Sequence, residues 1–407
     1  MSIWVRAVLS AASAAALTAS LSSCGGGATG TAACSGTVTV ATDMPSSGTD
    51  AAEGLAAQNG AQLAVTEADA DRLLGDCQVD LITRDDASQA LGTDDPRLGA
   101  SNMRALVANP AVIGVVGPLA SDVCASEEPV ANRAGLVLIS PACSDPGLTK
   151  AGSTLRSTGR ATFFRLCATD AGEAGTLSGE AWALGARVAY IIDDSEAESR
   201  ALGTQFGRDF VSAGGRVAGT SSLPGSTTDF HAALAAAAQA RADLVFFAGS
   251  SRSGGGRLRA QMAGSGLGKD VRFMGAAGIV NAGFISDAGA SAGASYASLP
   301  YPSALAGGAA AGFGANYRAT YGAAPLPVAA VAFDAMNVLL AAVSQAIAAA
   351  GGSPPAPARV LREAVRAQVA TSMVQGTTGE LRFDADGDRL SAPVSVVQVR
   401  NGTWVPL

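Results

Sequence analysis

Histidine is nearly absent from this sequence, which has one, His231, in 407 residues. A zinc site would therefore need cysteine or carboxylate ligands, and the chain contains no CxxC pair. A Gly-x-Ser-x-Gly sequence, the pattern of a nucleophile elbow, is also missing near His231. Thr228 and Asp229 precede His231, and either would cap a helix that begins here. We therefore expect a surface or capping histidine, no metal site, no cofactor and no enzyme.

Charged and aromatic side chains are also scarce, at 15% and 5% of the chain. The net charge of −7 is spread along the sequence without a basic cluster, which argues against a nucleic-acid partner. The few aromatic residues disfavour a large stacked ligand such as a nucleoside. After the amino-terminal segment, the longest apolar stretch is 328–350. Polar residues interrupt it, so we expect no transmembrane helix: Asp334, Asn337, Ser344 and Gln345.

The amino terminus has the pattern of an export signal. Arg6 precedes an Ala/Leu-rich segment, 7–21, and the tetrad Leu21-Ser22-Ser23-Cys24 resembles a bacterial lipobox. This pattern predicts that residues 1–23 are removed as a signal peptide, that Cys24 is lipidated and that 24–36 form a tether. The alternative is an ordinary secretory signal with an incidental cysteine. We expect an extracytoplasmic protein of the cell envelope, held to a membrane by lipid.

Lipidation would use one of the six cysteines, and export favours disulfides among the other five. Cys34 and Cys77 each come immediately before a predicted strand. If these strands are neighbours in a parallel sheet, both cysteines lie at the same sheet edge within bridging distance. We therefore predict a Cys34–Cys77 disulfide. One pair and one free thiol are expected among Cys124, Cys143 and Cys167, with Cys124–Cys143 preferred.

Short apolar strands alternate with helical segments, which is the pattern of a parallel α/β fold. The first series has strands at 37–41, 79–83, 112–116 and 136–139, with helices at 54–70 and 98–108. The second has strands at 187–192, 216–221, 244–247 and 272–275, with helices at 171–184, 202–213, 230–239 and 256–263. A helix at 328–350 and strands at 380–383 and 394–399 follow. The segment 384–388 lacks the glutamate of a calcium loop and predicts a β-turn.

Several blocks of the sequence match a known family in order and spacing. The most specific one comprises Gly117-Pro-Leu-Ala-Ser121, Leu136-Val-Leu-Ile-Ser140-Pro-Ala-Cys-Ser144 and Pro146-Gly-Leu-Thr149. Other blocks are 45–54, 84–86, Phe164-Arg165 with Asp170, and 383–388. Together they resemble the type I periplasmic binding proteins, specifically the branched-chain amino acid binding family of ABC importers. The resemblance covers about 37–405.

This resemblance implies two doubly wound parallel-sheet lobes joined by three hinge crossovers, near 166–170, 297–302 and 374–380. Lobe 1 would comprise 37–168 plus 302–375, and lobe 2 would comprise 170–298 plus 380–407. The ligand of such open parallel sheets lies beyond the carboxyl ends of the strands. We therefore expect the binding site in a cleft between the lobes.

The family's corner for the ligand α-carboxylate matches Ser121, Ala142 and Ser144 in this sequence. Hydroxyl groups and free backbone N–H groups at a helix start can hold an anion without a positive side chain. The alternative is that Ser121 and Ser144 are only helix caps. Ser47 and Asp170 lie in other matching blocks and are also predicted to contact the ligand.

The second lobe departs from the family pattern at the end that would hold the ligand ammonium. Branched-chain members carry a glutamate where this chain has Ala277, and an aromatic residue where it has Ser250 or Ser251. An unpaired buried ammonium costs several kcal/mol, so a leucine-type ligand is disfavoured. The exceptions would be pairing with Asp170, or with Glu198, which stands where the family has a tyrosine. A small polar carboxylate or amide is the expected ligand.

Arg252 follows this altered segment and leaves two interpretations open. It either meets a second anionic group of the ligand or lies on the surface beside the glycine-rich loop 253–256. The function expected from the resemblance is a monomeric solute receptor that delivers its ligand to ABC permease subunits. The alternative is a sensory or regulatory lipoprotein of the same fold that docks to another partner.

Overall fold

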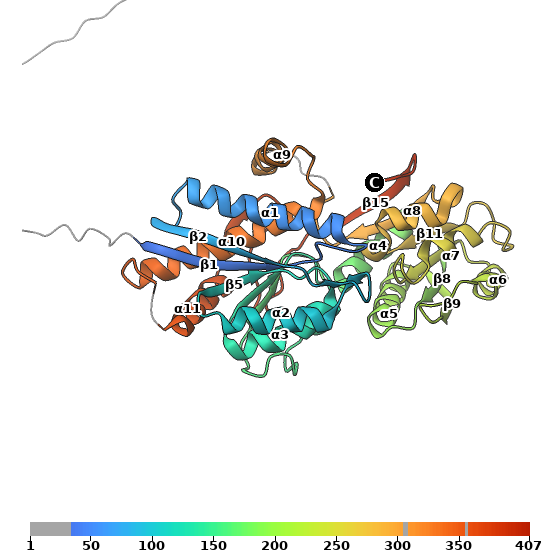
Figure 1. The fold of residues 1–407 in the computed structure, drawn as a ribbon. Helices are drawn as coiled ribbons and strands as arrows, with labels where there is room; N and C mark the ends of the chain where they lie inside the picture. Colours follow the sequence, from blue (N-terminus) through green and yellow to red (C-terminus); the bar gives the residue numbers. More distant parts are fainter. Residues whose placement is uncertain (1–33, 304–307, 355–356) are drawn as a thin grey trace, which may run out of the picture.

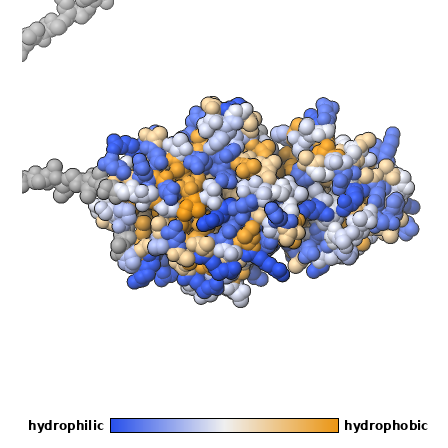
Figure 2. Space-filling model, in the orientation of Figure 1, coloured by the Kyte–Doolittle hydropathy of each residue, from blue (hydrophilic) through white to orange (hydrophobic). Residues whose placement is uncertain are grey.

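The computed structural model describes residues 34–303, 308–354 and 357–407, which form two lobes lying side by side (Figure 1). Each lobe is built on one large sheet with helices on both faces, which confirms the expected α/β class. The predicted signal peptide and Cys24 lie outside the described residues. Hydrophilic residues cover most of the face shown in Figure 2, and the hydrophobic residues exposed there lie mainly on the first lobe.

The first lobe contains a five-stranded parallel sheet in the order β2-β1-β5-β6-β7. Its strands are β1 (Ser35–Asp43), β2 (Asp76–Arg84), β5 (Val112–Val116), β6 (Val137–Ser140) and β7 (Phe163–Arg165). β5 lies at the centre and is buried along its whole length, as its uninterrupted apolar run predicts. Val116 of β5 pairs with Ile139 of β6 and with Thr42 of β1, so these strands end at one common edge.

Helices cover both faces of this first sheet (Figure 1). α1 (Ala51–Ala70), α10 (Pro327–Ala349) and α11 (Ala358–Ala370) share a hydrophobic core with one face. α2 (Pro96–Ala108) and α3 (Ser121–Ala134) share a core with the other. α9 (Gly308–Tyr321) contacts α1. Two small hairpins are added, β3 (Ala87–Ser88) with β4 (Thr93–Asp94) and β13 (Val374–Gly376) with β14 (Gly379–Leu381).

The second lobe contains a seven-stranded mixed sheet in the order β16-β15-β12-β11-β10-β8-β9. Its strands are β8 (Val188–Asp193), β9 (Arg216–Ser222), β10 (Leu244–Ala248), β11 (Arg272–Gly275), β12 (Ser295–Leu299), β15 (Ser395–Arg400) and β16 (Thr403–Pro406). α4 (Asp170–Ala183) and α5 (Ala197–Ser212) pack on one face. α6 (His231–Gln239), α7 (Gly255–Gln261) and α8 (Ala282–Ala288) pack on the other.

The chain passes between the two sheets along neighbouring segments. β7 of the first sheet leads to α4 on the second, β12 leads back toward α9, and the segment after β14 leads to β15. The backbone N–H of Ala168 donates to the Pro300 carbonyl at 2.7 Å, and Arg389 donates to the Leu166 carbonyl at 3.3 Å. These bonds hold the connecting segments against one another.

The long apolar segment of the sequence forms α10, which is a core helix. By length and composition it is the one helix among the described residues that could cross a membrane, but 78% of its apolar window is buried inside the protein. It crosses α1 closely at Gly60, where an added Cβ would lie 2.0 Å from the Ala329 carbonyl oxygen. Only glycine permits this approach of the two backbones.

His231 is the first residue of α6 and its side chain is 64% exposed. Asp229, one of the two caps considered from the sequence, accepts the His231 backbone N–H at 2.9 Å. The same carboxylate oxygen lies 2.7 Å from the imidazole Nδ1. The N-cap position of α6 is occupied by Phe230 without a side-chain cap bond, so neither Thr228 nor Asp229 is the N-cap.

Candidate ligand-binding cleft

A cleft of about 700 Å³ lies between the two sheets, and both lobes line it. The first lobe contributes the turns that follow β1, β5 and β6, and the second contributes those that follow β8, β10 and β11. Because parallel strands direct their carboxyl ends to one edge, these turns converge as the sequence pattern predicts. The volume is that of a small-molecule site.

The ligand residues predicted from the sequence reach the wall of this cleft with one exception. Those lining it are Ser121, Ala142, Ser144, Asp170, Ser250, Arg252 and Ala277. Ser47 is not among the lining residues, and its contact with a ligand stays a prediction. Its loop is held by Asp85, whose carboxylate accepts the Ser46 backbone N–H at 2.9 Å and interacts with the Ser47 side chain. The Ser47 hydroxyl is thereby drawn toward Asp85.

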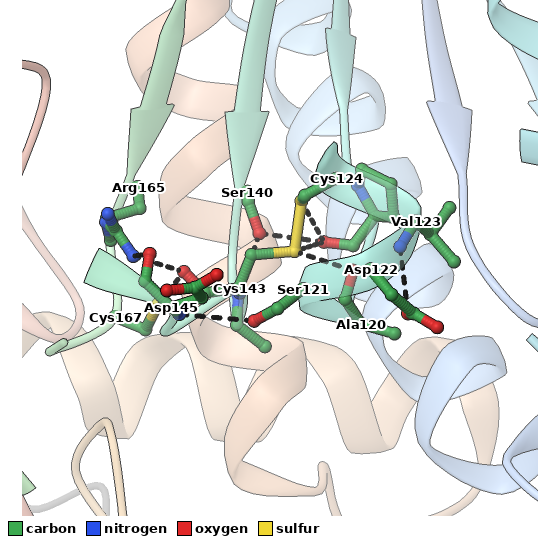
Figure 3. Close-up of a disulfide and its surroundings, with 12 residues drawn as sticks. Ala120, Ser121, Asp122, Val123, Cys124, Ser140, Cys143, Asp145, Arg165 and Cys167 are labelled. Carbon is green, nitrogen blue, oxygen red and sulfur yellow. Dashed lines mark hydrogen bonds between the residues drawn. A yellow bond between two sulfur atoms is a disulfide. The ribbon is translucent and has the colours of Figure 1, made fainter. Parts of the chain in front are cut away.

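The Ser121 and Ser144 corner is built where β5 and β6 end. The Asp145 backbone N–H donates to the Ser121 hydroxyl at 3.2 Å, so Ser121 links α3 to the turn after β6 rather than capping a helix (Figure 3). The Ser144 side chain interacts with the Asp170 carboxylate, and the Ser144 carbonyl accepts the Asp170 N–H at 3.0 Å. The corner therefore joins the first lobe directly to the start of α4.

A disulfide and a buried arginine hold this corner in place. Cys124 of α3 is bonded to Cys143 after β6, the preferred pair from the sequence, and the other predicted pair, Cys34–Cys77, is also present. Cys167 is free and buried. Arg165, fully buried, donates to the carbonyls of Cys143 at 2.9 Å and Asp145 at 2.8 Å (Figure 3).

Arg165 also ties this corner to the predicted turn near the end of the chain. Its Nε donates to Asp388 at 2.6 Å, and its Nη2 donates to the Thr149 hydroxyl. Asp384 accepts the backbone N–H groups of Asp386 and Asp388, so 384–388 is the expected turn. The sequence marked Arg165 only as part of a family block. Its role follows from contacts that sequence spacing does not reveal.

Carboxyl groups dominate the wall of the cleft. They come from both lobes: Asp50, Glu53, Asp94, Asp122, Asp145, Asp170, Glu173, Asp194, Glu196 and Glu198. Arg252 is the one basic residue among the lining residues that the structure describes. The negative charge is spread along the sequence, but folding brings these distant carboxyl groups together in the cleft.

Asp170, Glu173 and Glu198 form an acidic cluster at the boundary of the lobes. Glu198 enters from the start of α5, and the surrounding cleft walls and the charge of Asp170 raise its pKa to about 8. Burial also raises the pKa of Asp170, and the side chains of Asp170 and Glu198 interact directly. Ser121 interacts with Glu198 as Ser144 does with Asp170. The corner predicted to hold a ligand carboxylate therefore already faces two carboxyl groups of the protein.

Glu173 is the cluster member that sequence reasoning missed. It lies one helical turn after Asp170, and its side chain accepts the Ser298 hydroxyl at 2.6 Å and the Ala277 backbone N–H at 3.4 Å. Burial, followed by the charge of Asp170, raises the pKa of Glu173 to about 8. Position 277 has lost the family's glutamate, but α4 delivers another carboxyl group beside it. The spacing of three residues between Asp170 and Glu173 was the available signal.

Arg252 lies beside the loop 253–256 with its side chain 57% exposed, as one interpretation from the sequence expected, and its guanidinium crosses the cleft to the first lobe. Nη1 lies 3.1 Å from Asp50 Oδ2 and 3.7 Å from Asp94 Oδ2, and it also donates to Thr93. A second bond between distant segments joins the Tyr301 hydroxyl to Glu53 at 3.0 Å. Arg252 is therefore an ion-pair partner of lobe-one carboxylates.

Comparison with known proteins agrees with this geometry. Residues 37–403 match the family profile described as periplasmic binding protein. The leucine-binding protein LivK from Thermotoga maritima is 23% identical, with a TM-score of 0.74 over 91% of this chain and 97% of that one. LivJ from Streptococcus pneumoniae, in complex with isoleucine, is 25% identical, with a TM-score of 0.72 over 91% of this chain and 100% of that one.

A solute-binding protein from R. palustris in complex with benzoate is 20% identical, with a TM-score of 0.70 over 91% of this chain and 95% of that one. No curated protein sequence matches the chain. Two α/β lobes around a cleft, one with a parallel and one with a mixed sheet, have the type I periplasmic binding protein fold. This chain belongs to the periplasmic binding protein family, whose members are substrate-binding receptors and not enzymes.

Proposed function

We propose that this protein is the solute receptor of an ABC importer and carries a small polar, amino-acid-like ligand of the carboxylate or amide type. The observation that supports it is the cleft of about 700 Å³, which Ser121 and Ser144 line from one lobe and Glu173 and Ala277 line from the other. The similar structures contain isoleucine or benzoate, which are solutes of this size. The partners would be permease subunits and a membrane, through lipid on Cys24.

Binding would work by closure of the two lobes. A ligand that contacts both lobes stabilises the closed form by its extra contacts in that form, and the permease would recognise that form. We place the hinges at 166–170, 297–302 and 374–380, with lobe 1 as 37–168 plus 302–375 and lobe 2 as 170–298 plus 380–407. The hydrogen bond from Ala168 to Pro300 supports the first two placements, because it joins the segments 166–170 and 297–302.

The test combines thermal unfolding with small-angle X-ray scattering on residues 25–407 against amino acids, amides, dicarboxylates and small sugars. A ligand at 100 times its Kd should stabilise the folded state by about 2.7 kcal/mol. It should also reduce the radius of gyration. The Ser121→Ala, Ser144→Ala double variant should lose both responses. Binding that leaves the radius of gyration unchanged would contradict closure.

The response of the permease complex distinguishes a transport receptor from a sensory lipoprotein. A receptor of an importer should raise the ATPase rate of its permease complex in membranes when ligand is present. A lipoprotein that regulates another partner should leave that rate unchanged.

A further inference from the structure

The acidic cluster in the cleft has no positive partner from the protein. Among the ion pairs of the described residues, none includes Asp170, Glu173 or Glu198. The nearest arginines already have partners, since Arg252 pairs with Asp50 and Arg165 pairs with Asp388. No cationic side chain of the described protein therefore pairs with these carboxyl groups when they are ionised, and a bound cation would favour their ionised form.

Glu173 shows which kind of group is missing. Its side chain lines the cleft and is 1% exposed, and its Oε1 has no hydrogen-bond partner. A buried carboxylate oxygen without a donor is costly, and a ligand N–H with positive charge would satisfy both needs. The Ser121 and Ser144 corner offers a ligand carboxylate no unpaired group comparable to Glu173 Oε1, because these serines already interact with Glu198 and Asp170.

The surroundings narrow the chemical class of the cation. No group of three His, Cys, Asp or Glu side chains in the described part of the chain is arranged to hold a metal ion. Tyr301 is the one aromatic residue among the described lining residues, whereas quaternary ammonium groups are bound by cages of several aromatic rings. A nitrogen that carries hydrogen atoms suits carboxylate acceptors better than a metal ion or a quaternary ammonium group does.

We propose that the ligand is a small organic cation of net positive charge whose primary ammonium or amidinium group binds Asp170, Glu173 and Glu198. This inference rests on the proposed function: it selects cationic amides and basic amino acids within that ligand class and extends the class to amines. The exposed carboxyl groups that line the cleft, Asp122 and Glu196, raise the local concentration of such a cation there.

The experiment compares ligands that differ in charge and little else, by isothermal titration calorimetry on residues 25–407 at pH 7. Leucinamide is set against leucine, lysine against norleucine, and agmatine and putrescine against choline. We expect at least one cation with N–H groups to bind. Leucinamide and lysine should each bind at least about tenfold more tightly than leucine and norleucine, and agmatine or putrescine should do so relative to choline. Choline should bind no better than the neutral solutes.

Two isosteric variants locate the site of the cation. Glu173→Gln and Glu198→Gln should each weaken the tightest cation at least about tenfold, while the affinity for any neutral solute changes little. Glu180→Gln is the matched control, because it removes the same charge from α4 at a position outside the cleft lining. Thermal unfolding confirms that each variant folds.

The outcomes keep the two proposals apart. Leucine, isoleucine or benzoate binding with lobe closure, without binding of any cation, would overturn the cation inference and leave the receptor function standing. Equal weakening by Glu173→Gln and Glu180→Gln would also overturn it, since general electrostatic attraction would then explain the preference. If neither cations nor neutral solutes bind, the cation inference fails, and the receptor function fails with it if the wider panel also gives no closure.

Discussion

At the scale of single residues, the main feature of this protein is the number of carboxyl groups that it buries without a positive partner. Apart from the cleft, Asp43, Asp86 and Glu127 form a second such group inside the first lobe, each 0% exposed. Asn102 donates to Asp43 at 3.0 Å, but both oxygens of Asp86 and of Glu127 lack partners. These groups are more stable in the folded protein when they are protonated.

The free energy of unfolding should therefore fall as the pH rises. Burial raises the pKa of Asp43 to about 6 and that of Asp86 to about 8, and it places the pKa of Glu127 well above its ordinary value. In the unfolded chain these groups lose their protons near pH 4, so the folded state holds more protons between about pH 4 and 8. We expect a loss on the order of several kcal/mol between pH 5.5 and 8.5, because one group with a pKa near 8 already contributes about 3 kcal/mol over this range, and urea unfolding at each pH measures it.

A variant tests whether these residues cause the slope. Glu127→Gln should flatten the dependence on pH, whereas Glu380→Gln, at an exposed position on β14, should leave it unchanged. Greater stability at pH 8.5 than at pH 5.5 would contradict the explanation.

Residue-scale prediction from the sequence succeeded where backbone position alone decides the outcome. Ser121 and Ser144 follow the carboxyl ends of buried strands, so the sheet topology carries them to the cleft. The sequence did not reveal the side-chain contacts of two other predicted residues. Ser47 interacts with Asp85, and Arg252 pairs with a carboxylate of the other lobe. Glu173 was missed because a carboxyl group in a helix pattern looks like a solvent-facing residue until the packing is known.

At the scale of helices and strands, apolar runs were the reliable signal. The predicted strand 112–116 has the same bounds as β5, and the predicted strand 272–275 has those of β11. β7 and β12 were missed, because β7 has three residues that include Arg165 and β12 includes Ser298, which the cleft needs as a partner of Glu173. Polar residues kept for contacts at the lobe boundary therefore hide these strands from sequence patterns.

The α1–α10 crossing gives a prediction at this scale. Gly60→Ala should destabilise the protein by about 1–3 kcal/mol, because the new methyl group would meet the Ala329 carbonyl and force the two helices apart. Gly179→Ala on α4 is the matched control, since nothing lies within 4 Å of its added Cβ. The control should be neutral or more stable by about 0.5–1 kcal/mol, as helix propensity favours alanine. Denaturant unfolding of both variants measures the difference, and equal effects would contradict the close crossing.

At the scale of the whole molecule, the two lobes are joined by contacts across the cleft as well as by the connecting segments. Arg252 of the second lobe pairs with Asp50 and Asp94 of the first, and Tyr301 of the connecting segment 297–302 donates to Glu53 of the first lobe. The Arg252 ion pairs therefore link the two lobes directly. The two-lobe architecture was predictable from the order of strands, but the cross-lobe contacts were not, because their residues lie far apart in the sequence.

Removing the cross-lobe ion pair should favour the open form. Arg252→Met is expected to shift the ligand-free equilibrium toward open by about two- to fivefold, which corresponds to the modest energy of a partly exposed pair. Small-angle X-ray scattering should show a larger radius of gyration. Arg257→Met is the control from the same segment, because Arg257 pairs with Asp287 inside the second lobe. A larger radius in both variants, or in neither, would show that Arg252 does not restrain the lobes.

The Cys34–Cys77 cross-link would have a mechanical consequence if the proposed lipid on Cys24 holds the protein by its amino terminus. It joins Cys34, the residue before β1, to Cys77, the second residue of β2, at the end of the sheet remote from the cleft, a nine-residue strand or roughly 30 Å away. A pull on the leading segment is therefore borne by a covalent clamp between two adjacent strands and does not peel β1 from its neighbour. Opening and closing of the two lobes is then independent of tension on the amino-terminal segment, because the disulfide carries the force before it reaches the cleft.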